Sequence, residues 1–274
     1  MFAADDVEVV LCDLDGVVWL AHQPIPGSPE AIAAIRASGR RVLFVTNNSF
    51  STIAEQEAAL AAAGIPAEGD VVNSSQAAAG QLASGERVLA GGGAGLFEAL
   101  GEVGAVPLDP LDWDVAGRPP VAAVVMGLHR TFDYARLDAL SAAVRAGARF
   151  IATNDDATYP IPGGLVPGGG ALVAAVAVAS GVAPVVAGKP HRPMADLVAR
   201  RVGPGFAADR MLMVGDKAST DGAFAQTLGC QYALVRTGVT APGEPVDVPV
   251  AIDAPDLAAV AASRLDQHAA RLLV

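Results

Sequence analysis

VEVVLCDLDG, residues 7–16, joins a run of strand-forming residues to two carboxylates with one residue between them. The apolar run predicts a β-strand, and Asp13 and Asp15 follow at the point where that strand ends. Like charges held this close raise each other's pKa or require a cation, so the pair indicates a chemical site. The alternative is an ordinary turn, because Asp and Gly are both frequent turn residues.

Similar apolar runs recur between Ala-rich stretches that have helical spacing. Strands are predicted at 41–46, 121–126, 149–152, 185–187, 210–214 and 231–235, and helices at 28–38, 52–63, 132–147, 193–202 and 255–265. At the first of these helices Ser28 is the expected N-cap, Pro29 lies in the first turn and Gly39 follows the end. The alternation predicts βαβ units and therefore an α/β protein with a mainly parallel sheet.

The composition is that of a packed globular protein. Of 274 residues, 52% are hydrophobic and only 17% are charged, which allows one large domain or two smaller ones. A net charge of −11, with no run among the 18 basic residues, argues against a nucleic-acid partner. The most hydrophobic segment, 171–187, is short for a bilayer span and is interrupted at Gly181 and Pro184, so no membrane anchor is expected.

Two cysteines and an acidic N-terminus bear on the compartment. Cys12 and Cys230 each lie in an apolar run, where a small buried side chain is the expected role and a disulfide is not. Asp5, Asp6 and Glu8 stand where a signal peptide would carry Lys or Arg. A reducing, cytoplasmic location is therefore expected.

The candidate chemical residues are spread unevenly along the chain. They cluster before residue 50 and after residue 187, and a long middle part has its own strands and helices. This distribution predicts an insertion domain in a core built from both ends of the chain. Residues 109–120, rich in Pro, Asp and Trp, are expected to form a surface excursion.

Polar residues follow three more of the predicted strands, where ligands of open parallel sheets bind. Thr46-Asn47-Asn48-Ser49 offers a hydroxyl, amides and backbone N–H groups ahead of a helix, which suits a phosphate, although a helix cap is the alternative. Lys189 could balance the charge of a phosphate and of carboxylates, or be a surface lysine. Asp216 could bind a hard cation, with Asp221 holding the ion's waters or Lys189; the alternative is that Asp216 caps a helix and Asp221 lies in its first turn.

Taken in order, Asp13-x-Asp15-Gly16, Thr46-Asn47, Lys189 and Gly215-Asp216-x4-Asp221 resemble the four motifs of the haloacid dehalogenase superfamily of phosphatases. Residues 24–27, 46–49, 152–160, 167–168 and 188–190 extend the resemblance to the NagD-like, or nitrophenylphosphatase, branch. The resemblance implies a Rossmann-like parallel-sheet core with an inserted α/β cap. We place the core at 1–78 and 184–274 and the cap at 79–183.

The resemblance also implies a reaction. It is the Mg²⁺-dependent hydrolysis of a small phosphate monoester through an aspartyl-phosphate intermediate. Asp13 would be the nucleophile, and Asp15 would protonate the leaving oxygen and then activate water. Mg²⁺ would bind the carboxylates of Asp13 and Asp216 and the backbone carbonyl of Asp15. Asp221 would lie next to these ligands without binding the ion directly.

Phosphate binding and substrate choice fall to other residues of the resemblance. Thr46 and the backbone amide of Asn47 would hold phosphate oxygens, and Lys189 would stabilise the charge of phosphate and nucleophile. In the cap, residues 154–160 resemble a segment that lies over the pocket. The three residues of this segment expected to contact substrate are Tyr159, Asn154 and Asp156, although a buried structural loop is the alternative for the last two.

The substrate and several other properties stay open at this stage. Glycerol phosphate, phosphoglycolate, sugar phosphates, pyridoxal phosphate and nucleoside monophosphates are all candidate esters, and relatives of this kind often form homodimers through the cap. His129 is expected in a surface turn. His22 and His191 lie near motif segments and match no role in the family.

Two other kinds of protein share parts of this pattern. A phosphoacceptor receiver module also places acidic residues, Thr and Lys at strand ends, but it is about half this length and has its phosphorylated Asp on a later strand. A dinucleotide-binding enzyme is suggested by the glycines at 91–95. The G-x-G-x-x-G spacing fails there, because Leu96 stands where the third glycine is needed.

Overall fold

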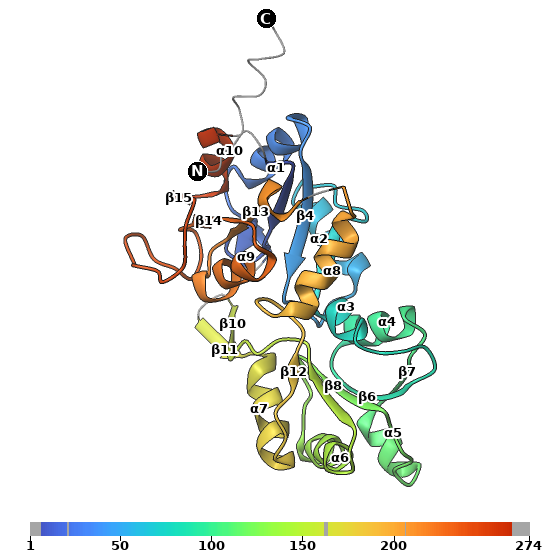
Figure 1. Ribbon diagram of the computed structural model, residues 1–274. Coiled ribbons are helices and arrows are strands. Elements are labelled where there is room, and N and C mark those ends of the chain that lie inside the picture. The colour runs from blue at the N-terminus through green and yellow to red at the C-terminus, as the bar shows by residue number, and fades with distance from the viewer. Residues whose placement is uncertain (1–6, 21, 162–163, 206, 265–274) are drawn as a thin grey trace, which may run out of the picture. The chain divides into compact units, whose positions relative to one another are not determined.

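The computed structural model describes residues 7–20, 22–161, 164–205 and 207–264 (Figure 1). The chain divides into two compact units. The first comprises Met1–Thr46, Gln56–Val72 and Val198–Val274, and the second comprises Asn47–Glu55 and Asn73–Leu197. The boundaries of these units differ from residues 79 and 183, the predicted ends of the cap. The bounds given above for the core and the cap therefore stay a prediction.

The first unit is built on a six-stranded sheet. Its strand order is β15 (Ile252–Ala254), β14 (Gln231–Val235), β13 (Met211–Gly215), β1 (Val9–Cys12), β4 (Arg41–Thr46) and β5 (Val71–Asn73). β1 pairs in parallel with β4 and β13, and β14 pairs in parallel with β13 and β15. Every residue of β1 is fully buried, as expected of a central parallel strand. The prediction of a Rossmann-like parallel sheet is confirmed.

Helices cover this sheet. α1 (Ser28–Ala37) packs against β4 and against α10 (Leu257–Arg264), and α9 (Ala223–Leu228) packs against β13 and β14. A short antiparallel pair, β2 (Trp19–Leu20) and β3 (Gln23–Pro24), follows the first motif. α2 (Ile53–Ala62) and α8 (Arg192–Val202) each have residues in both units.

The prediction that Ser28 is the N-cap of α1 is wrong. The cap residue is Gly27, whose φ of 84° lies in the left-handed region that glycine adopts without strain. Ser28 is the first helical residue, and its buried hydroxyl donates to the carbonyl of Val17 at 3.0 Å. The side chain of Ser28 thus links α1 to the segment that contains Val17, and the backbone conformation of Gly27 starts the helix.

The second unit has its own five-stranded sheet. The order is β12 (Val185–Val186), β9 (Arg149–Ala152), β8 (Ala123–Met126), β6 (Arg87–Gly91) and β7 (Val106–Leu108), and all pairs are parallel. The other elements are the helices α3 (Ser74–Ala79), α4 (Ala94–Glu102), α5 (Pro110–Val115), α6 (Tyr134–Arg145) and α7 (Gly169–Ser180) and the hairpin of β10 (Thr158–Ile161) and β11 (Gly164–Pro167). Met126, Leu140, Phe150 and Val176 lie in its buried core.

Residues 109–120, expected to be a surface excursion, contain α5 and contribute to this core. Asp109 caps the helix by accepting a hydrogen bond from the N–H of Leu111 at 2.8 Å, and Pro110 lies in the first turn. The side chain of Trp113 is 4% exposed, and its Nε1 donates to the carbonyl of Pro119 at 2.7 Å. Burial of this indole favours a folded segment over an extended one.

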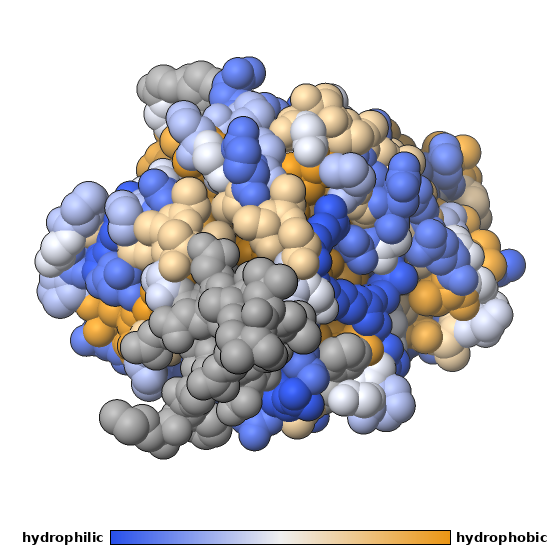
Figure 2. Space-filling view, turned by 90° about the horizontal axis from the view of Figure 1, so that it is seen from above, coloured by the Kyte–Doolittle hydropathy of each residue, from blue (hydrophilic) through white to orange (hydrophobic). Residues whose placement is uncertain are grey.

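The observed bounds of the helices and strands agree closely with those predicted from the sequence. β4, β9 and β14 have the predicted bounds, and the five predicted helices are present with their described ends shifted by at most two residues. Residue 265, the last of the predicted 255–265 helix, and the acidic residues Asp5 and Asp6 lie outside the described residues. In the part of the chain that the structure describes, no helix is both long enough and apolar enough to cross a membrane. Figure 2 shows hydrophilic and hydrophobic residues interspersed over one face.

Candidate active site

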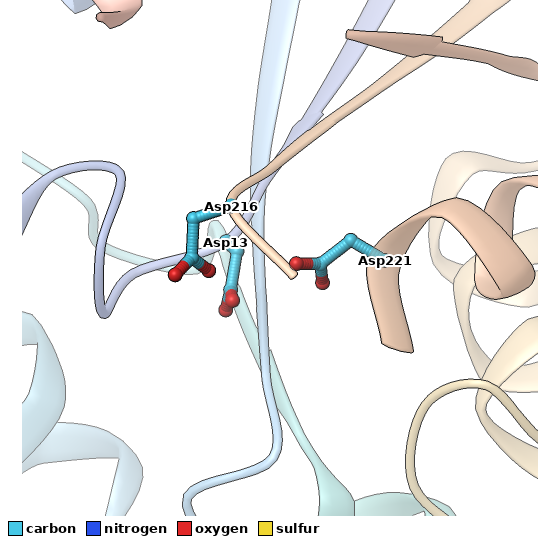
Figure 3. A group of neighbouring side chains, drawn as sticks. All are labelled: Asp13, Asp216 and Asp221. Carbon is cyan, nitrogen blue, oxygen red and sulfur yellow. The ribbon is translucent and has the colours of Figure 1, made fainter. Parts of the chain in front are cut away.

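Three carboxylates meet in the first unit. Asp13 follows β1, Asp216 follows β13, and Asp221 lies in a π-helical turn, Ala218–Gly222. One carboxylate oxygen of each residue lies within 4.8 Å of one from both others. Figure 3 shows the carboxylates of Asp13 and Asp216 side by side, with that of Asp221 pointing toward them.

The register of the sheet brings these residues together. Cys12 of β1 is paired with Val214 of β13 and with Phe44 of β4, so the residues that follow leave the sheet at the same edge. The N–H of Asp13 donates to the carbonyl of Val214 at 3.0 Å, which continues the pairing by one residue. Thr46, 2% exposed, ends β4 at this edge. Of the predicted site residues, this unit therefore brings Asp13, Thr46, Asp216 and Asp221 to one edge of its sheet.

The backbone encloses the carboxylate of Asp216. The N–H of Val239 donates to its Oδ2 at 2.5 Å. A Cβ atom added to Gly16 would lie 2.4 Å from that oxygen, and one added to Gly238 would lie 1.9 Å from it. Only glycine allows two backbone segments to approach so closely. Gly238 and Val239 were missed by the sequence reasoning, because no apolar run or motif marks their loop.

Asp221 is fully buried and is held in a similar way. The N–H of Lys217 donates to its Oδ2 at 3.2 Å. A Cβ atom added to Gly215 would lie 2.2 Å from its Cγ. The carboxylate thus has one fixed place beside the strand that carries Asp216.

The electrostatics of this edge are strongly negative. Burial raises the pKa of Tyr232, and the charges of Asp221, Asp216 and Asp13 raise it further. Its hydroxyl donates to the carbonyl of Gly215 at 3.2 Å. Carboxylates this close, two of them buried and that of Asp13 half-buried, repel one another unless a cation balances them, and oxygen ligands are those that Mg²⁺ prefers. The donor set therefore fits a magnesium ion.

Asp15 is oriented differently from Asp13. The indole Nε1 of Trp19 donates to its Oδ1 at 3.1 Å, and its side chain is half-buried. Oδ1 of Asp13 instead accepts from the N–H of Leu14 at 2.8 Å. Neighbouring hydrogen bonds thus hold the two carboxylates of the first motif in separate orientations.

The second unit joins Asn47 to Lys189 and to the segment after β9. The amide of Asn47 contacts both the backbone of Lys189 and the carboxylate of Asp156, and Asn154 donates to the carbonyl of Asn47 at 2.9 Å. Lys189 is 1% exposed, which excludes an ordinary surface lysine. Tyr159 lies half-buried in β10. Substrate contact by any of these residues stays a prediction.

The three histidines flagged in the sequence have ordinary neighbours. The ring of His22 lies 5.1 Å from that of Trp19, centroid to centroid, and Nε2 of His191 lies 3.3 Å from Oδ2 of Asp155. His129, expected in a surface turn, is half-buried. Burial and the charge of Arg136 lower its pKa.

The glycines at 91–95 pack against the chain itself. A Cβ atom on Gly93 would lie 2.5 Å from the ring of Phe50, and one on Gly95 would lie 2.1 Å from the carbonyl oxygen of Ser51. The N–H of Gly95 donates to the carbonyl of Phe50 at 2.9 Å. These glycines accommodate residues 50 and 51, which leaves no support for a dinucleotide site there.

Comparison with known proteins gives the family. Residues 10–106 match haloacid dehalogenase-like hydrolases, and residues 186–261 match a second model of the same hydrolase type. The chain is 40% identical to D-glycerol 3-phosphate phosphatase of Mycobacterium tuberculosis over 86% of its own length and 65% of that protein. It is 33% identical to phosphoglycolate phosphatase 2 of Arabidopsis thaliana over 89% of this chain and 87% of that one.

Solved structures agree. The glycerol phosphate phosphatase of Mycobacterium tuberculosis in complex with magnesium has a TM-score of 0.80 and 37% identity, covering 97% of this chain and 79% of that chain. The 4-nitrophenylphosphatase of Thermotoga maritima has a TM-score of 0.84 and 28% identity, covering 94% and 97%.

The chain belongs to the haloacid dehalogenase-like hydrolases, among the NagD-like and nitrophenylphosphatase-type phosphatases. It is a phosphoric monoester hydrolase that acts on small molecules and uses Mg²⁺.

Proposed function

We propose that Asp13 is the nucleophile and forms an aspartyl-phosphate. Its carboxylate oxygen attacks phosphorus, the bond to the ester oxygen breaks, and water then releases phosphate from Asp13. Asp15 gives its proton to the leaving oxygen and later takes one from the attacking water. The separate hydrogen bonds of Asp13 to Leu14 and of Asp15 to Trp19 support this division of roles.

Three other residues hold the phosphate in this proposal. The hydroxyl of Thr46 and the backbone N–H of Asn47 donate to phosphate oxygens, and the ammonium group of Lys189 balances their charge. Thr46 ends β4 at the sheet edge that also carries Asp13 and Asp216, which supports a role of this kind.

Asp13, Asp216 and the backbone carbonyl of Asp15 would bind Mg²⁺, and Asp221 lies beside them. When bound, the ion supplies positive charge that offsets the repulsion between the nucleophile and the phosphate. A carboxylate oxygen of Asp221 lies within 4.8 Å of one from each of the other two residues, which supports a direct or water-mediated part in the same site.

For the substrate we propose glycerol phosphate, with phosphoglycolate as the second candidate. The names of the relatives support these two esters. Tyr159 is proposed to contact the leaving group. The measurement is kcat/KM for glycerol 3-phosphate, phosphoglycolate, pyridoxal phosphate, a sugar phosphate and a nucleoside monophosphate, and a higher value for any of the last three would reject the assignment.

The mechanism is tested by phosphate release with and without Mg²⁺. Asp13→Asn removes the nucleophile while preserving shape, so we expect kcat to fall about 10³-fold or more with little change in thermal stability. Chelation of divalent cations is expected to abolish turnover of the wild type. Activity without divalent cations, or full activity of Asp13→Asn, would rule the mechanism out.

We also propose that the protein forms a homodimer through the second unit and resides in the cytoplasm. α7 carries no charged residue, and Val178 on it is 86% exposed. Light scattering is expected to give the mass of a dimer for the wild type and of a monomer for Val178→Glu. Val115→Glu on α5, where the side chain is 91% exposed, is the matched control and should stay dimeric. A monomeric wild type would reject the dimer.

A further inference from the structure

Asn47 contacts the backbone on both sides of Lys189. Its Oδ1 accepts a hydrogen bond from the N–H of Lys189 at 2.8 Å, and its Nδ2 donates to the Lys189 carbonyl at 3.1 Å. Two hydrogen bonds to one residue fix the orientation of its backbone as well as its position. Because the side chain of Lys189 is buried, the placement of this backbone determines where its ammonium group lies.

Asp156 reinforces the orientation that the Lys189 backbone gives to the amide of Asn47. An ionised carboxylate only accepts hydrogen bonds, and Oδ2 of Asp156 lies 2.9 Å from Nδ2 of Asn47. The NH₂ group therefore faces Asp156 and the Lys189 carbonyl, which leaves Oδ1 for the Lys189 N–H. Turning the amide over would place its oxygen against two acceptors and its NH₂ group against a donor.

The surrounding backbone is shaped for this contact. A Cβ atom added to Gly188 would lie 2.6 Å from Oδ1 of Asn47, so the glycine before Lys189 lets the amide approach. Asn154 ties the segment of Asp156 to the same place. Its Oδ1 accepts from the N–H of Asp156 at 3.2 Å, and its Nδ2 donates to the Asn47 carbonyl.

We propose that Asn47 and Asp156 are positioning residues that hold Lys189 in place for the phosphate, resting on the proposed function in which Lys189 balances phosphate charge. Phosphoryl transfer depends mainly on placement and electrostatics, and a misplacement of about 1 Å costs about 10²-fold in rate. In this role Asp156 acts through Asn47 and does not touch the substrate. In this proposal the side chain of Asn47 forms hydrogen bonds with the backbone of Lys189, and the backbone N–H of Asn47 donates to the phosphate.

Two substitutions of Asp156 separate this role from a loss of charge. Asp156→Asn keeps an oxygen that can accept from Nδ2 of Asn47, whereas Asp156→Ala keeps none. We expect kcat to fall about 30-fold in Asp156→Ala and no more than about threefold in Asp156→Asn. Asp155→Ala is the matched control, because Asp155 is an exposed neighbour that contacts His191, and it should retain the wild-type kcat.

Exchanging the two partners gives a second test. Asn47→Asp places two carboxylates face to face and leaves the Lys189 carbonyl without its donor, so kcat should fall about 10²-fold. Adding Asp156→Asn restores a donor opposite the new carboxylate. The double variant is therefore expected to recover about tenfold over Asn47→Asp. A double variant no better than Asn47→Asp, with all variants folded by circular dichroism, would overturn the proposal.

A readout that does not depend on turnover completes the test. Amide hydrogen exchange at Lys189 should be at least about tenfold faster in Asp156→Ala than in the wild type and Asp156→Asn, because the amide of Asn47 loses one of its partners and holds this N–H less firmly. Unchanged exchange would overturn the proposal even if the enzyme released no phosphate from any ester. An unchanged kcat with a raised KM in Asp156→Ala would also overturn it, by assigning Asp156 to substrate contact.

Discussion

At the scale of single residues, glycines set how closely the backbone surrounds the acidic cluster. Gly16 has a φ of 82° and lies against the carboxylate of Asp216. Glycine is required at this position of the Asp13-x-Asp15-Gly16 motif because the carboxylate of Asp216, far away in the sequence, occupies the space that a Cβ atom would take. The backbone at Gly16 and Gly238 and the hydrogen bond from Val239 together hold the carboxylate of Asp216 in place.

We predict that Gly16→Ala weakens Mg²⁺ binding. The added Cβ would meet Oδ2 of Asp216 and force a metal ligand to move, so the Mg²⁺ concentration for half-maximal activity should rise about tenfold. Gly39→Ala is the control, because Gly39 has a φ of 84° and nothing within 4 Å of its Cβ position. It should lower stability by about 1 kcal/mol and leave the Mg²⁺ requirement unchanged. Equal Mg²⁺ requirements in the two variants would contradict the prediction.

His129 gives a prediction for the dependence of stability on pH. Burial, and then the charge of Arg136, lowers its pKa below the unfolded value, while Asp109 and Asp133 act in the opposite direction. The folded protein therefore binds this proton less readily, and stability is lost as pH falls from about 6.5 toward the lowered pKa. Urea unfolding at pH 8 and pH 5 should show a smaller loss for His129→Gln than for the wild type. An equal loss would mean that His129 does not contribute.

The candidate site was most readily predicted from the sequence where a polar residue follows an apolar strand. Asp13, Thr46, Lys189 and Asp216 all meet this condition. Gly238 and Val239 do not, because their loop has no periodic pattern and reaches Asp216 only through tertiary packing. The contact of Asn47 with Asp156 joins residues 109 positions apart, a pairing that a local pattern does not encode.

At the scale of elements, the turn between β6 and α4 is shaped around residues 50 and 51. The glycines of this turn let the backbone of Phe50 and Ser51 approach α4, and the guanidinium of Arg130 lies 4.6 Å from the centre of the Phe50 ring. Within the second unit, the segment after Thr46 is therefore held by the turn between β6 and α4. The spacing of glycines in the sequence reflects this packing.

We predict that Gly95→Ala displaces this segment. An added Cβ would lie 2.1 Å from the Ser51 carbonyl oxygen, and the segment joins directly to the proposed phosphate-binding residues Thr46 and Asn47, so KM should rise and stability should fall. Gly101→Ala is the control within the same helix, since its Cβ position is open. It should stabilise the protein by about 0.5–1 kcal/mol. Thermal unfolding and KM for glycerol 3-phosphate check both variants, and a wild-type KM in Gly95→Ala would contradict the prediction.

Elements were predictable where pattern and end signals agree, as at β4 and β14. Elements were not predictable from the sequence where their burial depends on a single large side chain. Residues 110–115 form a helix that starts at an Asp cap and a Pro and buries the side chain of Trp113, and α7 has no polar face from which a helical period could be measured. Tertiary contacts decide such segments, and local sequence does not.

At the scale of the whole molecule, each unit has its own sheet and buried core, and the acidic cluster lies within the first. All three carboxylates belong to the first unit. A ligand that binds only the folded form stabilises the part that binds it. Mg²⁺ is therefore expected to act on one unit more than on the other.

The two tryptophans make this testable, because Trp19 lies in the first unit and Trp113 in the second. In Trp113→Phe, fluorescence of Trp19 should report a transition that Mg²⁺ at 100 times its dissociation constant shifts by about 2.7 kcal/mol. In Trp19→Phe, fluorescence of Trp113 should report a smaller shift. Asp216→Asn, which removes a ligand from the first unit, should abolish the shift seen by Trp19. Equal shifts for both tryptophans would mean that the two units unfold together, since Mg²⁺ would then stabilise a single cooperative structure.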